Sequence, residues 1–346
     1  MSASNQARLK NALRLTLPAG IIVFLLWRLE PEDWNAIQEH SIGWPRLLGA
    51  FCIALIAIAT SYMRWWILVL AQGIRLSVLE AFRISAICFL LSFVSVGSVG
   101  GDLFKAVFLA KRSPGKKVAS IASVFVDRAT GLYGLFVVVA AGLWLRERSD
   151  SFEFAGLGIE QYQWIVLGLL VGATMALLLL VLGGKTVDRL VQSAESWPLV
   201  GSVIRHAAPP LRTFHEHPGA LLCSLALSVV VQSLLVVSFD QISGALGSEP
   251  PTLSEHFVIV PLSMLASALP ITPGGVGVLE AALEALYSIV PARVPDVSGT
   301  LVGLFFEFVK LAIAMVGTAF YWTAGREVRE SLDAADALSE SEAAAS

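Results

Sequence analysis

Long apolar runs follow one another along the chain, separated by short polar segments. Six of these runs approach or exceed the roughly 20 residues that a helix needs to cross a membrane. They lie at 15–29, 47–71, 118–145, 162–183, 220–246 and 299–323, and the first is the shortest. We predict that all six are transmembrane helices.

Two further apolar stretches, 85–110 and 256–290, contain helix breakers near their middle: SVGSVGGD in the first and ITPGGVG in the second. Each half is roughly 12–17 residues long, and at about 1.5 Å per residue most such halves are shorter than a hydrocarbon core of about 30 Å. Each stretch is therefore either one distorted crossing or a hairpin that enters and leaves on the same side.

The distribution of Lys and Arg decides between these two alternatives. Arg75 and Arg83 precede the centre of the first broken stretch, and 111–117 adds four more basic residues after it. Because basic segments stay in the cytoplasm, both ends of this stretch belong on the cytoplasmic side. If Arg326 and Arg329 are cytoplasmic as well, the second stretch must enter from the outside.

The same order of elements occurs twice, in opposite orientation: a crossing, a broken stretch and a crossing at 47–145 recur at 220–323. Inverted repeats with broken helices near the midplane are a recurring transporter plan. We predict an all-α polytopic membrane protein with about six transmembrane helices and two re-entrant broken-helix hairpins in an inverted repeat. Residues 1–324 would form a single membrane domain, and 325–346 an acidic cytoplasmic tail that we expect to be disordered.

The composition agrees with a membrane protein and argues against several other classes. Of 346 residues, 56% are hydrophobic and 15% charged, with a mean hydropathy of +0.73. Soluble domains are about 45–50% apolar and about 25% charged. The glycine-rich segments follow no strand, which argues against nucleotide binding. We predict no cofactor, no metal site, no nucleic-acid partner and, because no nucleophile–base pair stands out, no enzymatic activity.

Ionisable residues lie inside the predicted membrane segments, where they usually pair or line a path for polar cargo. These candidate substrate-binding residues are Asp102, Lys105, Asp127 and Arg128 in the first repeat, and Glu280, Glu307 and Lys310 in the second. Structural alternatives remain open. Asp102 can cap a helix, and Arg128 can form a salt bridge with Asp102 or with a glutamate of the second repeat. Lys105 and Lys310 can each pair with the acid three residues before it.

The helix breakers are candidates of a second kind. Gly101 stands before Asp102, and the second break contains Pro273, Gly274, Gly275 and Gly277. We expect new helices to begin near residues 102 and 276. A helix start exposes backbone amides and partial positive charge, so each break can direct a helix N-terminus at an anion. The alternative is that these residues only kink the helices or allow close packing.

The motif PGGVGVLE, from Pro273 to Glu280, resembles the signature of the flippase-like integral membrane family, which includes the membrane region of lysyl-phosphatidylglycerol synthases. GDLFKA at 101–106 and VDRATGL at 126–132 resemble two further landmarks of that family. The chain departs from the family pattern at Asp127-Arg128, where relatives often have Glu-Arg. No soluble aminoacyl-transferase domain follows in the sequence, so we expect no synthase activity.

With this resemblance, the leading hypothesis is a lipid flippase or scramblase. Its substrate would be a membrane lipid with a phosphate-bearing anionic or zwitterionic headgroup, either a polyprenyl-phosphate-linked sugar or an aminoacylated phospholipid. Enzymes of lipid or glycan biosynthesis are expected partners. We expect a plasma-membrane location, in a bacterial inner membrane, with both termini cytoplasmic. Two alternatives stay open: a small-solute or ion secondary transporter, and a membrane enzyme or assembly factor of lipid-linked glycan synthesis.

Overall fold

The computed structural model describes residues 42–92, 99–145, 153–154, 157–182, 213, 215–268, 277–291 and 293–322. This part of the chain contains nine α-helices and one pair of two-residue strands. The predicted crossing at 15–29 and the predicted tail at 325–346 lie outside it, as do the centres of both predicted breaks, 93–98 and 269–276.

Five long helices coincide with five of the six predicted crossings. They are α3 (Trp44–Ala71), α6 (Lys117–Leu145), α7 (Ile159–Leu182), α10 (Pro218–Leu246) and α13 (Gly299–Trp322). By length and apolar character, α3, α6, α7 and α10 are able to cross a membrane. The 24 residues of α13 give a helix of about 36 Å. The all-α polytopic fold is therefore confirmed, apart from the short antiparallel pair β1 (Glu153–Phe154) and β2 (Leu157–Gly158).

Each predicted broken stretch yields two short helices. The first gives α4 (Val78–Ser92) and α5 (Val99–Arg112), and the second gives α11 (Leu253–Ser267) and α12 (Val278–Ile289). Helices of 12 to 15 residues are about 18–22 Å long, which is less than a hydrocarbon core. None of the four can cross a membrane alone as a straight helix.

Two predicted helix starts were wrong by a few residues. Helix α5 begins at Val99 instead of Asp102, because the glycines fall in its first turn, where they are tolerated. Helix α12 begins at Val278 instead of near residue 276, because Gly277 has φ +93° and precedes the helix. A helical conformation requires negative φ, so the residue at 277 cannot belong to the helix.

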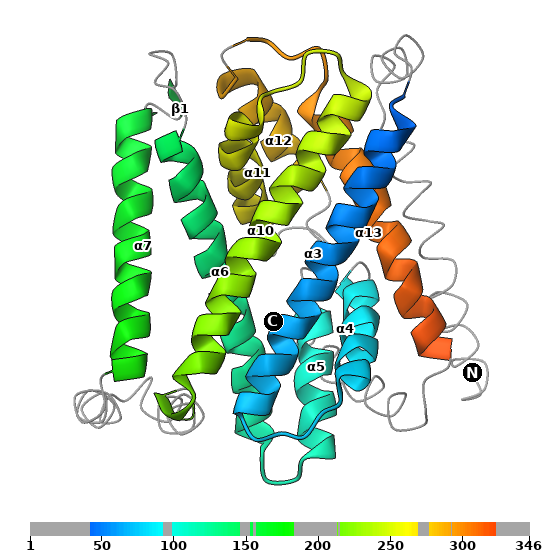
Figure 1. The fold of residues 1–346 in the computed structure, drawn as a ribbon, viewed down its shortest axis with the longest axis vertical. Helices are drawn as coiled ribbons and strands as arrows, with labels where there is room; N and C mark the ends of the chain where they lie inside the picture. The colour runs from blue at the N-terminus through cyan, green and yellow to red at the C-terminus, as the bar shows by residue number, and fades with distance from the viewer. Residues whose placement is uncertain are drawn as a thin grey trace, which may run out of the picture.

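The helices show the inverted order of the two predicted repeats (Figure 1). Helix α3 runs from one end of the molecule to the other, α4 and α5 lie at that second end, and α6 runs back. Helix α10 lies beside α3 and runs the opposite way, α11 and α12 lie at its far end, and α13 returns. Entry of the two short pairs into a membrane from opposite sides stays a prediction.

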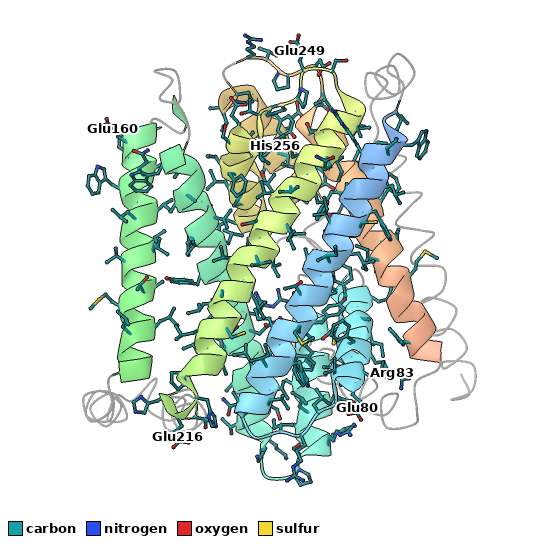
Figure 2. All side chains as sticks on the ribbon, in the orientation of Figure 1. Glu80, Arg83, Glu160, Glu216, Glu249 and His256 are labelled. Atoms are coloured by element: carbon teal, nitrogen blue, oxygen red, sulfur yellow. The ribbon has the colours of Figure 1, made fainter. Side chains whose placement is uncertain are left out.

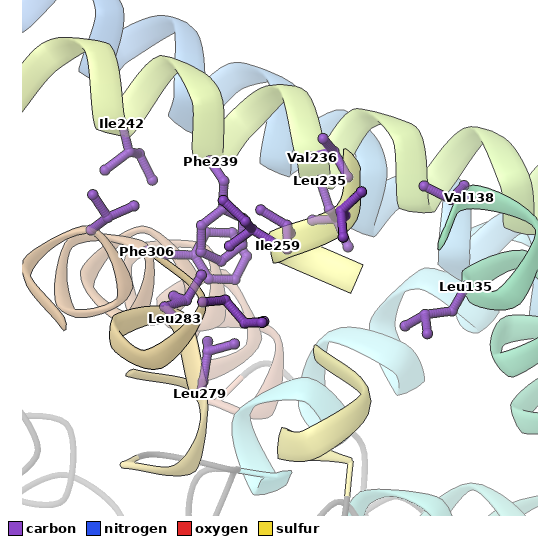
Figure 3. Close-up of a cluster of buried hydrophobic side chains, with 14 of the residues drawn as sticks. Leu135, Val138, Leu235, Val236, Phe239, Ile242, Ile259, Leu279, Leu283 and Phe306 are labelled. Carbon is purple, nitrogen blue, oxygen red and sulfur yellow. The ribbon is translucent and has the colours of Figure 1, made fainter. Parts of the chain in front are cut away.

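Two apolar cores hold the short pairs in place. The larger core joins α11 and α12 to the long helices, and its centre is the contact between Phe239 and Phe306, whose ring centroids are 4.1 Å apart (Figure 3). The smaller core packs α4 and α5 against the second half of α3 and includes Trp65, Ile84 and Phe104. Both pairs are thus fixed by side-chain packing, which positions the ionisable residues they carry.

Candidate functional site

Helices α5 and α6 bring Asp102 and Arg128 together in a bidentate ion pair. Arg128 Nε donates to Asp102 Oδ2 at 2.7 Å, and Nη2 donates to Oδ1 at 2.9 Å. The Arg128 side chain is nevertheless 53% exposed. Its Nη1 has no hydrogen-bond partner among the residues that the structure describes. The salt bridge considered as an alternative therefore forms, and it leaves one edge of the guanidinium available.

A second ion pair lies beside the first and is buried. Arg64 Nε, on α3, donates to Asp127 Oδ1 at 2.8 Å, and both side chains are about nine-tenths buried. Arg64 Nη1 also donates to Ser228 Oγ of α10 at 2.9 Å. The pair thus ties α3, α6 and α10 together. It gives Asp127 a structural partner that the sequence did not reveal.

Lys105 completes this group, but it does not pair with Asp102 in the way considered from the sequence. Its Nζ lies over the ring of Trp65, 4.7 Å from the centroid, a cation–π contact. We refer to Arg64, Asp102, Lys105, Asp127 and Arg128 as the first-repeat cluster. It contains three cations and two carboxylates, so positive charge is in excess.

Gly101 has a packing role that the structure makes visible. A Cβ placed on Gly101 would lie 2.5 Å from the carbonyl oxygen of Cys88 on α4. Only glycine lets α4 and α5 approach this closely. Its predicted contribution to an anion site stays a prediction beside this structural role.

The second repeat brings together Glu280 of α12 with Glu307 and Lys310 of α13, which we call the second-repeat cluster. Lys310 Nζ lies 2.6 Å from Glu307 Oε1, so the pairing of these residues considered from the sequence is confirmed. Gly303 lies one turn before Glu307, and a Cβ placed there would be 2.9 Å from Glu280 Cγ. Both glutamates are almost fully buried, at 1% and 0% exposure.

The start of α12 provides a hydrogen-bond donor for one carboxylate oxygen of Glu280. The Gly277 amide donates to Glu280 Oε2 at 2.5 Å, which caps the helix. Glu280 Oε1 and both oxygens of Glu307 are buried, and among the residues that the structure describes they have no hydrogen-bond partner. The ion pair with Lys310 is the one salt bridge that Glu307 makes among these residues. Pro273, Gly274 and Gly275 lie outside the described residues, so their role in aiming a helix start at an anion stays a prediction.

The lysylphosphatidylglycerol synthase TM region family matches residues 11–335 of the chain. The chain belongs to this family. The match spans both repeats and also the predicted first crossing. No curated protein and no solved structure matches the chain.

Membership of the lysylphosphatidylglycerol synthase TM region family confirms the resemblance seen in the motifs. Together with the four helices able to span a bilayer, it makes the chain an integral membrane protein. The family name connects the chain with membrane-lipid proteins and does not identify a lipid that this chain binds.

This member of the lysylphosphatidylglycerol synthase TM region family also has a buried polar network near the end where α11 begins (Figure 2). His256 is fully buried, and its Nε2 lies 2.9 Å from the hydroxyl of Tyr287, which in turn donates to Ser243 Oγ at 3.2 Å. His256 Nδ1 faces the carbonyl of Thr252 at 3.1 Å and Asp240 Oδ1 at 3.4 Å.

Sequence reasoning missed Arg64, His256 and Tyr287 as members of polar clusters. A signal was present for the first two, because each is an ionisable residue inside an apolar stretch. Tyr287 gave no such signal, because a tyrosine in an apolar helix is usually a packing residue. The contact with His256 also gives Asp240 a partner in this network.

Proposed function

We propose that the protein is a lipid flippase or scramblase that moves an anionic or zwitterionic lipid between leaflets and does not alter it chemically. The observation that supports this most directly is the half-exposed Arg128, whose Nη1 has no partner among the described residues, in a cluster with excess positive charge. A phosphate group fits this chemistry, because a guanidinium edge donates planar hydrogen bonds to its oxygens.

The position of the cluster supports a lipid more than a free ion. Arg128 lies in α6, a helix long and apolar enough to cross a membrane. A headgroup that meets fixed charges at this depth avoids much of the cost of entering hydrocarbon, while its tails remain in lipid. Family membership is consistent with such a substrate. A polyprenyl-phosphate-linked sugar and an aminoacylated phospholipid both carry the required phosphate.

We further propose a bacterial inner-membrane location with both termini in the cytoplasm. The end of the molecule that carries Arg83, and with it α4 and α5, would face the cytoplasm (Figure 2). Single cysteines at Ser113 and Ser248 test this orientation. A membrane-impermeant maleimide added outside should label the second and not the first, and the reverse pattern would invert the topology.

The direct test is reconstitution into liposomes with a panel of fluorescent lipids, followed by measurement of transfer between leaflets. The panel contains a neutral diacylglycerol, an anionic phospholipid, an aminoacylated phospholipid and a polyprenyl phosphate. We expect the protein to accelerate transfer of at least one phosphate-bearing lipid and not to accelerate the spontaneous transfer of the diacylglycerol, which has no charged headgroup. A folded protein that transfers none of these lipids would contradict the proposal. Uptake of a soluble ion or solute would favour a secondary transporter, and chemical turnover of a labelled lipid would favour an enzyme.

Variants of Arg128 connect the activity to the cluster. Arg128→Ala should reduce transfer by roughly 10–100-fold, the loss expected for one charged hydrogen-bonded contact. Arg128→Lys should keep part of the activity, because a point charge remains. Arg83→Ala removes an exposed arginine at the same end and is the matched control. If Arg128 only balances Asp102, the double variant Arg128→Ala, Asp102→Asn would restore transfer.

A further inference from the structure

The second-repeat cluster contains more negative charge than its surroundings can stabilise. The cluster holds two buried glutamates, Glu280 and Glu307, and one ammonium group, that of Lys310, which pairs with Glu307. The two carboxylates are close enough to interact electrostatically, since Glu280 packs over Gly303, one turn from Glu307 on the same helix. If all three groups are ionised, one negative charge remains uncompensated in a buried site.

Hydrogen bonding does not relieve this charge. Glu280 Oε2 accepts one hydrogen bond from the Gly277 amide. Within the described part of the chain the other three carboxylate oxygens accept no regular hydrogen bond, and the ammonium group of Lys310, 2.6 Å from Glu307 Oε1, is the contact that offsets charge. An ionised carboxylate that loses water without gaining hydrogen bonds is so costly that such a group normally takes up a proton and becomes neutral.

Charged groups on α12 itself and on the helices that contact α12 or α13 are already engaged. From α10 and α11, Asp240 and His256 contact each other, and Glu255 caps α11 through Thr252. On α12, Glu284 Oε2 accepts the Thr300 amide. From α3 and α4, Arg64 pairs with Asp127 and Arg83 lies over the ring of Phe320. Lys310 is therefore the one cation found beside the two glutamates within the described part of the chain.

We propose that Glu280 and Glu307 share one proton, so that the second-repeat cluster is a proton-binding site that couples transport to a proton gradient. The proton comes from water and adds to a carboxylate oxygen, which gives a neutral carboxylic acid and leaves the cluster without net charge. The neutral state suits a closed, dry cluster, and the ionised state suits one that is open to water. Proton binding stands on the cluster alone, whereas coupling rests on the proposed transport of lipid.

Infrared difference spectroscopy of the reconstituted full-length protein tests proton binding without any transport assay. We expect the carbonyl band of a protonated carboxylic acid at neutral pH, and its loss in Glu307→Gln or Glu280→Gln. Glu307→Gln is the primary variant, because Glu280 also caps α12. Glu284→Gln, one turn further along α12, is the matched control and should keep the band. Absence of the band from the wild-type protein, or its persistence in both variants, would overturn the proposal.

A control without sodium distinguishes proton binding from the binding of a metal cation at this site. Replacement of sodium by choline at fixed pH should leave the band unchanged. If the carboxylic-acid band instead appears only when sodium is removed, the site binds a monovalent metal ion and the proposal is wrong.

The coupling part is tested by imposing a pH gradient on the liposomes. With one proton per lipid, each pH unit should support up to about a tenfold ratio of labelled lipid between leaflets. Glu307→Gln should lose this accumulation, whereas the control variant Glu284→Gln should keep it. A wild-type protein with the band but no lipid transfer would defeat the proposed function and leave the proton site intact. Lipid transfer without the carboxylic-acid band would support the proposed function and contradict the proton site. Lipid transfer that does not respond to the pH gradient would contradict the proposed coupling.

Discussion

The α4–α5 pair and the α11–α12 pair lie at opposite ends of the molecule and follow the same order of elements (Figure 1). Their charged residues differ sharply. The first-repeat cluster has excess cations and a half-exposed arginine, Arg128. The second-repeat cluster has excess carboxylates, and Glu280 and Glu307 are almost fully buried. One backbone plan therefore supports two sites with opposite requirements, because apolar runs and breakers determine the helices while a few side chains determine the charge.

The two pairs are also held together differently. In the first, Gly101 allows close backbone contact with Cys88, and the exposed ion pair Glu80–Arg112 joins α4 to α5. In the second, the buried contact between His256 and Tyr287 joins α11 to α12. Buried polar contacts contribute more to stability than exposed ion pairs when a partner is removed. The second pair should therefore be more sensitive to loss of its polar link.

The largest effect is expected at the buried ion pair of the first repeat. Arg64→Ala leaves Asp127 without its partner and should lower the free energy of unfolding by about 3–5 kcal/mol. Thermal unfolding in detergent measures this change. Arg128→Ala should cost clearly less, because the Arg128 side chain is half exposed. The double variant Arg64→Ala, Asp127→Asn should recover part of the loss. Equal costs for the two arginines would contradict the distinction between a buried and an accessible pair.

The glycines of the two pairs should respond to substitution for different reasons. Gly101→Ala forces a Cβ against Cys88 and should cost about 1–3 kcal/mol through overpacking. Gly277→Ala places an L-residue at φ +93° and should cost roughly 1–2 kcal/mol. Gly49→Ala in α3 is the control, because nothing lies within 4 Å of its added Cβ. We expect it to be neutral or slightly stabilising. Unfolding in detergent compares the three, and a neutral Gly101→Ala would show that α4 and α5 can separate freely.

Tyr287→Phe tests the buried link of the second pair. The substitution removes the hydroxyl between His256 Nε2 and Ser243 Oγ and leaves both without this partner. We expect a loss of about 1–3 kcal/mol, measured by thermal unfolding. The double variant Tyr287→Phe, His256→Phe would show whether the cost arises from the unpaired imidazole. A single variant as stable as the wild type would mean that this network does not hold α11 to α12.

The smallest effect is expected at the ion pair between Glu80 and Arg112, which joins α4 to α5. Burial alone raises the pKa of Glu80, but hydrogen bonds from Ser77 and Arg112 outweigh it and lower the pKa below its ordinary value of 4.5. A lowered folded-state pKa stabilises the protein above pH about 4.5, and this contribution is lost as the pH falls through the folded value. Because both side chains are about one-third exposed, the contribution should be at most about 1 kcal/mol.

The measurement for this link is unfolding as a function of pH for the wild type and for Glu80→Gln. The two curves should differ at neutral pH and converge under acidic conditions. A difference that grows as the pH falls would reverse the sign of the pKa shift.

The sequence alone determined the five long helices of the described part of the chain, and their order, to within a few residues. The predicted runs 118–145 and 299–323 correspond to α6 at Lys117–Leu145 and α13 at Gly299–Trp322. This succeeded because the length of an apolar run and the position of its breakers are local properties that a membrane-spanning fold must respect. The starts of α5 and α12 needed the structure, and the positive φ of Gly277, which places the start of α12, cannot be inferred from composition.

Only the tertiary structure decided how the charges pair. Arg128 meets Asp102 from 26 residues away, and Arg64 meets Asp127 from 63 residues away. The sequence named three of these residues and missed Arg64. Likewise, it named Glu280 and Glu307 without showing that both are buried beside one lysine. Pairing and burial depend on which helix faces pack together, and that is a property of the whole fold that no single segment contains.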